Sequence, residues 1–164
     1  MTARSRSTHL DGRGRARMVD VGSKPLTARV ARARGRVRMQ PAALEAIRRG
    51  TVPKGDVLAV ARIAGIQAAK ETSRLLPLCH SLPLDAVEVE ARVDLAAGAV
   101  TLEAKVACRG ATGVEMEAIV AVSIAAAAIY DMCKALDRGM IIEGIELVEK
   151  SGGRSGHYRN PRRA

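Results

Sequence analysis

Residues 118–130 of the chain read AIVAVSIAAAAIY, an almost unbroken run of small apolar side chains. A helix that is apolar around its whole circumference is buried on all sides in a folded domain. The uncharged run is shorter than the roughly 20 apolar residues that a membrane span needs. We therefore expect a central core helix with ionisable residues held at both edges of the core. These residues are Glu115, Glu117, Asp131 and Lys134.

Alternating patterns on either side of this helix predict strands. Between residues 31 and 39, small or apolar residues take the odd positions and arginines take the even positions. Residues 87–93 and 100–106 also alternate, and their connection is short enough for an antiparallel hairpin. A last strand is expected at about 140–149. The arginine face of the first strand is more often a solvated outer face than a binding platform.

Helix start and stop signals complete the order of elements. Pro41 suits the first position of a short helix over 42–49. Asp56 can cap a longer helix from residue 57 to about 76, which Pro77 stops. The resulting order predicts an α+β fold of the ferredoxin-like split βαβ type. In that fold a four-stranded antiparallel sheet has its helices packed on one face.

Length and charge bound the possible functions. A chain of 164 residues suits one domain, and a net charge of +10 indicates an anionic partner. Arginines crowd both ends, so we expect tails over 1–17 and 157–164 around one catalytic domain over 18–156. RNA-recognition modules share the fold but stack bases on aromatic residues, and this chain has no Phe or Trp. A non-catalytic, basic RNA-binding module therefore remains only the alternative hypothesis.

Cysteine usage favours a reducing compartment. Cys79, Cys108 and Cys133 are widely spaced and form no Cys-x-x-Cys pair. The basic N-terminal stretch is followed by no apolar segment of the secretory type. We expect a cytoplasmic protein.

Two groups of polar residues could carry chemistry near the ends of the core helix. Asp131 and Lys134 share one helix face, and they are either a surface ion pair or an acid/base pair. Lys54 precedes a helix start, where backbone amides attract anions, and it is otherwise a solvated loop lysine. Glu115 or Glu117 could line a site or complement the helix dipole.

Two further segments stand out. Pro77 places Cys79 and His80 in a turn, which suggests a nucleophile, a zinc pair or, better, a histidine that donates a hydrogen bond or carries a proton. No further Cys or His lies at zinc-ligand spacing. The glycine-rich basic segment 150–156 lacks the order of a P-loop. It could wrap an anion or form a flexible tail.

Taken together, seven stretches resemble the MoaC family of molybdenum-cofactor biosynthesis, the cyclic pyranopterin monophosphate synthases. The resemblance covers about residues 18–156 and departs from the usual pattern at Ser81 and Arg154. The stretches are MVDV at 18–21, KGDV at 54–57, ARIAGIQAAK at 61–70, LPLCH at 76–80, TGVEME at 112–117, IYDMCKA at 129–135 and KSGGRSG at 150–156.

The resemblance implies a cytoplasmic phosphorus–oxygen lyase. Such an enzyme converts 3',8-cyclo-7,8-dihydroguanosine 5'-triphosphate, made by a radical S-adenosylmethionine GTP cyclase, into cyclic pyranopterin monophosphate and releases pyrophosphate. It implies a homohexamer, a trimer of dimers, with active sites at subunit interfaces. It implies no tightly bound cofactor or metal, although Mg²⁺ can accompany the triphosphate. Neither a membrane nor a specific nucleic acid is expected as a partner.

The resemblance also assigns site residues. Asp131 falls on the family's active-site aspartate, with Lys134 and Lys54 as further catalytic residues. The residues assigned to substrate binding are Leu78, Cys79, His80, Glu115, Met116, Glu117, Lys150 and Arg29. A triphosphate substrate would explain the cations, since departing pyrophosphate needs cationic stabilisation. Ring opening and reclosure move several protons, which suits a cluster of lysines and carboxylates.

Overall fold

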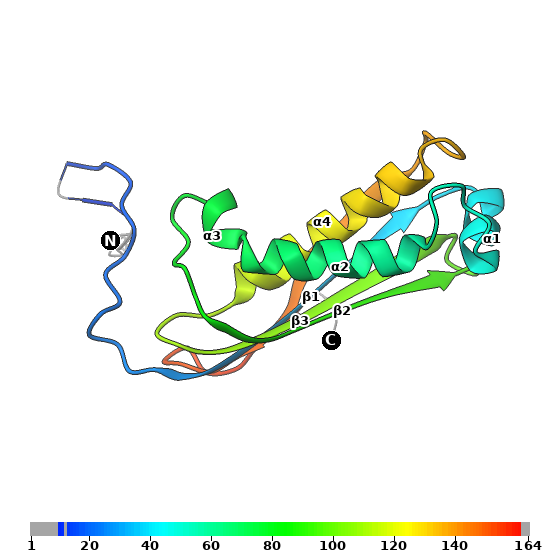
Figure 1. Ribbon diagram of the computed structural model, residues 1–164. Coiled ribbons are helices and arrows are strands. Elements are labelled where there is room, and N and C mark those ends of the chain that lie inside the picture. The colour runs from blue at the N-terminus through cyan, green and yellow to red at the C-terminus, as the bar shows by residue number, and fades with distance from the viewer. Residues whose placement is uncertain (1–9, 12, 162–164) are drawn as a thin grey trace, which may run out of the picture.

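One antiparallel sheet, covered by helices on one face, forms the fold of the computed structural model, which describes residues 10, 11 and 13–161 (Figure 1). The predicted tail 1–17 lies largely outside these residues, and its described part makes an isolated bridge between Leu10 and Ala16. The elements are β1 (Thr27–Arg38), α1 (Pro41–Arg49), α2 (Val57–Lys70), α3 (Thr72–Leu75), β2 (Leu84–Asp94), β3 (Ala99–Gly110), α4 (Glu115–Cys133), β4 (Ile141–Ser151) and β5 (Tyr158–Arg159).

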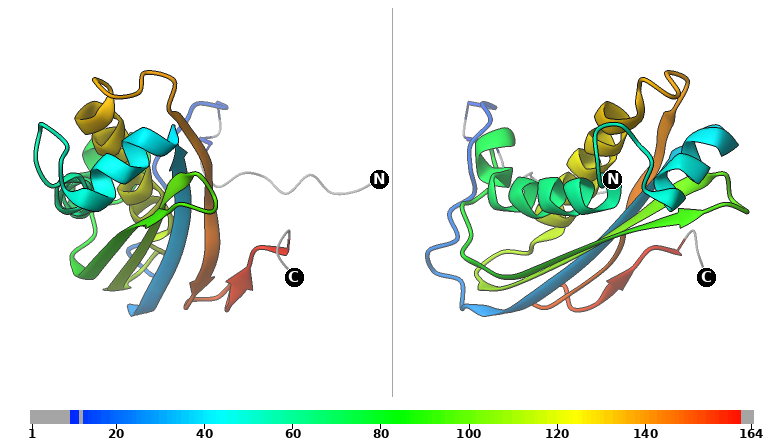
Figure 2. Two further views of the ribbon diagram at one scale, coloured as in Figure 1. Left: turned by 90° about the vertical axis from the view of Figure 1, so that its right-hand side faces the viewer. Right: turned by 45° about the vertical axis from the view of Figure 1, so that its right-hand side comes forward.

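The sheet has the strand order β2-β3-β1-β4-β5 with antiparallel neighbours throughout. The helices lie on the same side of the sheet in both views of Figure 2, which confirms the predicted α+β, ferredoxin-like arrangement. The predicted four strands gain a short fifth at one edge. There Tyr158 pairs with Lys150, and the amide of Asn160 donates to the carbonyl of Val148 (2.9 Å). The C-terminal segment expected to be a tail thus folds back along β4 at these residues.

The core helix α4 packs on β1, β3 and β4 of the sheet and lies beside α2, which packs on β2. Ala121, Ala125 and Ile129 have no exposed surface. By length and composition alone α4 could cross a membrane, with a mean hydropathy of 1.7, but 56% of that window is buried inside the fold. The small side chains let α2 and the strands approach closely. The helix therefore serves as the core of the domain, as the sequence predicts.

The long helix expected over 57–76 is interrupted at Glu71. The amide of Glu71 donates to the carbonyls of both Gln67 and Ala68, and the hydroxyl of Thr72 also donates to Ala68 (3.2 Å). This competition for one acceptor distorts the regular helical ladder. A four-residue helix, α3, follows and ends at Leu75. The next residue, Leu76, has the extended backbone that is favoured before proline.

Gly65 of α2 lies where the backbone of α2 approaches α4 closely. A Cβ atom placed at Gly65 would lie 2.9 Å from the carbonyl oxygen of Ala121 and 3.2 Å from the methyl groups of Val89. Backbone and branched side chains on both sides cannot move aside easily. The contact therefore fixes how α2 lies across α4 and against β2.

We expect Gly65→Val to lower the free energy of unfolding by about 1–3 kcal/mol, the usual cost of overpacking a core. Thermal denaturation of the variant and the wild type, at equal protein concentration, measures the loss. Gln67→Val is the matched control, because Gln67 is exposed on the same helix and carries only the small propensity cost of a β-branched residue. Equal midpoints for Gly65→Val and wild type would contradict the close contact.

Candidate active site

A cavity of about 400 Å³ lies at the N-terminal end of α4. One wall is the turn after α3, in which the amide of Cys79 donates to the carbonyl of Leu76 (3.0 Å). The first turn of α4 supplies the other wall. The predicted substrate-binding residues that line the cavity are Leu78, Cys79, His80, Glu115, Met116 and Glu117.

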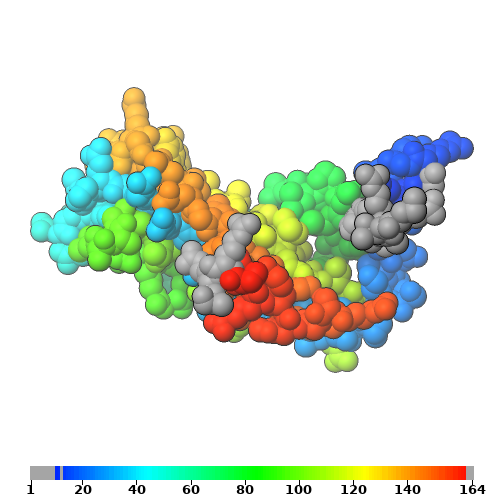
Figure 3. All heavy atoms as spheres, turned by 180° about the vertical axis from the view of Figure 1, so that it is seen from behind, coloured from blue at the N-terminus to red at the C-terminus, as the bar shows by residue number. Residues whose placement is uncertain are grey.

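A second cavity of about 540 Å³ adjoins the first. Arg29 from β1, Glu115 from α4 and Lys150 from β4 line it, together with the glycine-rich segment after β4. The two cavities share Lys24, Thr112, Gly113 and Glu115. In the space-filling view from behind, a hollow lies between the blue N-terminal segment and the green part of the chain (Figure 3). The structure thus brings every predicted substrate-binding residue to one end of the molecule.

The segment before β1 contributes residues to the site that the sequence analysis did not assign. Val19, Val21 and Lys24 line the first cavity. The Nε2 atom of His80 lies 2.7 Å from the carbonyl oxygen of Val19, so Nε2 carries the proton and donates. His80 is therefore a hydrogen-bond donor, as one of the sequence interpretations expected. The sequence did carry a signal for Val19 and Val21, because both lie in the MVDV stretch at 18–21, one of the stretches that resemble the MoaC family.

The carboxyl group of Glu117 is buried in the first cavity. Only 5% of the residue is exposed, and burial raises the pKa of this carboxyl above its ordinary value, with a further contribution from the charge of Glu115. Burial, followed by the charge of Glu117, also raises the pKa of the Cys79 thiol. A thiolate at Cys79 is disfavoured in this environment, which argues against its use as a nucleophile.

Glu115 and Lys150 join the first turn of α4 to the end of β4. The Nζ atom of Lys150 lies 3.0 Å from a carboxylate oxygen of Glu115 and donates to the hydroxyl of Ser155 (2.7 Å). These side chains are roughly three-quarters buried, with 23% and 27% exposure for Lys150 and Glu115. The contact places a cation on the wall of the second cavity. Glu115 thus lines the site and is also the first residue of α4, so both interpretations of this residue apply.

Asp131 bridges two lysines at the other end of α4. Its carboxylate oxygens lie 2.8 Å from Nζ of Lys54 and 2.8 Å from Nζ of Lys134. Hydrogen bonds from Lys134 and then Lys54 lower the pKa of Asp131 to about 2, and the carboxylate in turn raises the pKa of Lys134. The side chains of Lys54, Asp131 and Lys134 are 45%, 57% and 53% exposed. Within one chain the cluster is therefore exposed to solvent.

The two groups of predicted site residues lie at opposite ends of one rigid helix. At about 1.5 Å of rise per residue, Glu115 and Asp131 are separated by about 24 Å along the axis of α4. A single substrate molecule cannot contact both groups within one chain. One chain therefore holds two separate groups. The substrate-binding residues lie at one end of α4, and Lys54, Asp131 and Lys134 lie at the other end.

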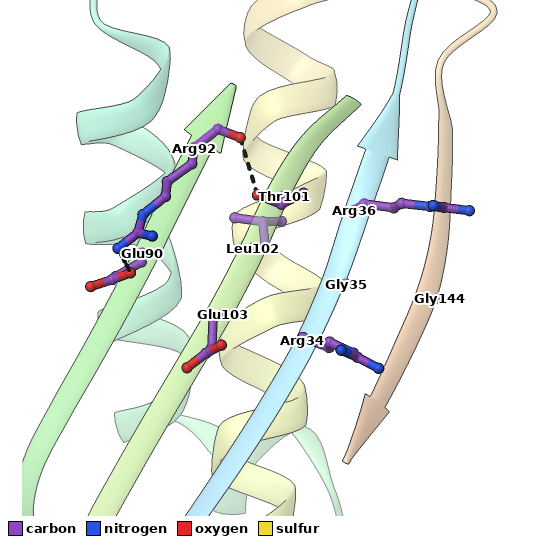
Figure 4. Close-up of a pocket in the computed structure, with 9 residues that line it drawn as sticks. All are labelled: Arg34, Gly35, Arg36, Glu90, Arg92, Thr101, Leu102, Glu103 and Gly144. Carbon is purple, nitrogen blue, oxygen red and sulfur yellow. Dashed lines mark hydrogen bonds and ion pairs between the residues drawn. The ribbon is translucent and has the colours of Figure 1, made fainter. Parts of the chain in front are cut away.

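The arginine face of β1 is solvated and balanced by glutamates. Arg34 pairs with Glu146 (2.7 Å) and Arg36 with Glu143 (2.8 Å), while Arg32 contacts Glu103 and Glu149. Figure 4 shows Arg34 and Arg36 extending from β1 toward β4 on this outer face. The face is no open cationic platform, which weakens the RNA-binding alternative. Among residues 10, 11 and 13–161, no group of three or more His, Cys, Asp and Glu residues could hold a metal ion.

The raised pKa of Glu117 predicts a pH-dependent stability. The folded protein binds this proton more tightly than the unfolded chain, so the contribution is fully present below pH 4.5 and is lost as the pH rises through the folded pKa. We expect Glu117→Gln to raise the thermal midpoint relative to wild type at neutral pH. The gain should shrink toward pH 4.5. Glu115→Gln removes only the smaller, charge contribution to the raised pKa of Glu117 and also breaks the ion pair with Lys150, so it should show no such gain. A wild-type-like midpoint for Glu117→Gln at pH 7 would refute the assignment.

Comparison with known proteins identifies the family. The MoaC family model matches residues 18–153. The cyclic pyranopterin monophosphate synthase of Chloroflexus aurantiacus is 59% identical over 98% of both chains. The proteins of that name from Chloroflexus aggregans and Thermomicrobium roseum are 62% and 59% identical, over 93% of this chain and 92% of theirs. The resemblance seen in the sequence motifs is confirmed over almost the whole chain, and the chain belongs to the MoaC family.

Proposed function

We propose that this chain is a cyclic pyranopterin monophosphate synthase of molybdenum cofactor biosynthesis. The reaction converts 3',8-cyclo-7,8-dihydroguanosine 5'-triphosphate into cyclic pyranopterin monophosphate with release of pyrophosphate, as a phosphorus–oxygen lyase. The observation that carries the proposal is the identity of 59–62% to synthases of that name over nearly the full chain. An assay of pyrophosphate release from the cyclised GTP derivative tests it directly.

The two adjoining cavities suit the two halves of this substrate. The second cavity presents Lys24, Lys150 and Arg154, which can neutralise a triphosphate and stabilise the departing pyrophosphate. Mg²⁺ would arrive with the triphosphate as part of the substrate. The first cavity offers the buried carboxyl of Glu117 and the imidazole of His80 to the ring system. Both groups can exchange hydrogen bonds with ring nitrogens of the substrate.

The lysine–aspartate cluster supplies proton transfer. A carboxyl group with a pKa of about 2 is a weak base, so Asp131 stays ionised and orients the ammonium groups of Lys54 and Lys134. A lysine held in its charged form by this carboxylate can donate a proton to a leaving ring nitrogen or oxygen. Asp131 and Lys134 thus act as one unit, in which Asp131 fixes the charge and position of the proton donor.

A second copy of the chain would complete the site. Opposite ends of α4 hold the two groups of residues, and apolar side chains on the helices remain uncovered, among them Val60 (40% exposed), Ile63 (66%) and Ile124 (39%). A two-fold axis across these helices would bury the apolar surface and bring Asp131 of one copy to the cavities of the other. The hexamer, a trimer of dimers, is the assembly proposed here.

The cellular setting belongs to the same proposal. The substrate is a product of radical chemistry on GTP, so a radical S-adenosylmethionine GTP cyclase must act first. The free thiols of Cys79, Cys108 and Cys133 support a cytoplasmic location, since such thiols persist in a reducing compartment.

We expect Asp131→Asn and Lys134→Ala each to lower turnover by about 100- to 10,000-fold, the usual contribution of a positioned proton donor. Assembly and triphosphate binding should remain, because the cations of the second cavity are untouched. The double variant should be scarcely slower than either single variant, as for residues that work as a unit. Near-normal turnover in both single variants, or losses that multiply, would reduce the pair to a structural ion pair and move the acid/base role to Lys54 and His80.

A mixed assembly tests the shared site. Asp131 lies near the C-terminal end of α4, and Lys150 of β4 contacts Glu115 at its N-terminal end. Asp131→Asn and Lys150→Ala should each inactivate the enzyme. Assemblies formed from equal amounts of both chains should recover about a quarter of wild-type turnover, because random pairing across a two-fold axis leaves that share of sites intact. Pyrophosphate release from co-expressed, doubly tagged enzyme measures the recovery.

The control for this experiment pairs Asp131→Asn with Lys134→Ala. Both residues lie in the same cluster of one chain, so mixing cannot restore any intact cluster. No recovery is expected there. Recovery in the control as well, or in neither mixture, would contradict a site shared between copies.

A further inference from the structure

The guanidinium group of Arg29 donates hydrogen bonds to main-chain carbonyl groups at the edge of the second cavity. Its Nε atom donates to the carbonyl oxygen of Gly110 (3.1 Å), and its Nη2 atom donates to that of Ala111 (3.3 Å). Gly110 is the last residue of β3, and Ala111 begins the loop that leads to α4. The planar guanidinium group therefore holds the loop that carries Thr112 and Gly113 into both cavities.

The third nitrogen of the guanidinium group lies against the turn that follows β4. A Cβ atom at Gly153 would lie 1.6 Å from Nη1 of Arg29, and one at Gly152 would lie 2.0 Å from the carbonyl oxygen of Ala28. Gly152 and Gly153 also have positive φ, 99° and 71° respectively. Only glycine allows the turn to close around the arginine in this way. The turn begins just after Lys150 and carries Ser155, its hydrogen-bond partner.

We infer that Arg29 is a positioning residue and not a phosphate ligand. It ties β1 to the two walls of the second cavity, the β3–α4 loop and the glycine turn, and thereby fixes the distance between Glu115 and Lys150. Nε and Nη2 each donate to a main-chain carbonyl oxygen, and Nη1 is packed against Gly153 of the turn, so the main chain holds the guanidinium group on both sides. The structural part of this role is independent of the proposed function. Only its expected effect on turnover rests on that function.

Comparison of Arg29→Lys with Arg29→Ala separates the two roles. A lysine keeps the charge and binds phosphate as a point charge, but it cannot reproduce the fork that holds two carbonyl groups. We expect both variants to lose about 100-fold in kcat, the cost of misplacing a site by about 1 Å. A phosphate ligand would instead give a lysine variant close to wild type and an alanine variant whose main defect is a raised KM.

Hydrogen exchange without substrate gives a readout independent of activity. Mass spectrometry should show faster amide exchange in segments 108–114 and 150–156 of both variants, with the assembly and the thermal unfolding of the rest preserved. Arg109→Lys is the matched control, since Arg109 is exposed beside Gly110 and should leave exchange and kcat unchanged. Exchange at wild-type rates in both Arg29 variants would overturn the inference. If wild-type enzyme releases no pyrophosphate, the proposed reaction fails, while the exchange data still decide the role of Arg29.

Discussion

The buried helix α4 is the constraint on which the rest of the structure depends. Its alanine-rich surface lets β1, β3 and α2 pack around it, and its regular backbone fixes the separation of its two ends. Glu115 and Glu117 begin the helix within the cavities, and Asp131 stands near its other end. A rigid rod of this length keeps the groups apart within one chain. The same helix that stabilises the fold therefore makes the proposed site depend on a second copy.

Charge is used in two different ways on this protein. On the outer face of the sheet, Arg34 and Arg36 are matched by glutamates of β4, so this surface has little net attraction for anions. Exposed ion pairs of this kind contribute little stability each. Near the cavities, by contrast, Lys150 lies on a half-enclosed wall where its charge is less screened by water. The overall charge of +10 thus does not identify the binding surface, and the position of each cation does.

Local patterns predicted most elements because their causes are local. Alternation of arginine with small residues gave β1, Asp56 caps α2 through the amide of Ala59 (2.9 Å), and Pro77 follows the end of α3. The helix break at Glu71 was not predicted, because no glycine or proline marks it in the sequence. The break arises where the amide of Glu71 and the hydroxyl of Thr72 share the carbonyl of Ala68 as acceptor. Strand β5 was missed because two residues carry no alternation, and their pairing depends on the turn that precedes them.

The sequence by itself determined the fold class, the family and the chemical character of the candidate site, since these follow from periodicity and from motifs that are contiguous in the chain. Only the tertiary structure decided which motifs meet. It placed Lys54 on Asp131 and the turn around His80 beside Glu117, and it assigned Arg29 to main-chain carbonyls rather than to open space. Contacts between residues far apart in the sequence depend on how α4, α2 and the sheet pack, because packing fixes the distances that no local pattern encodes.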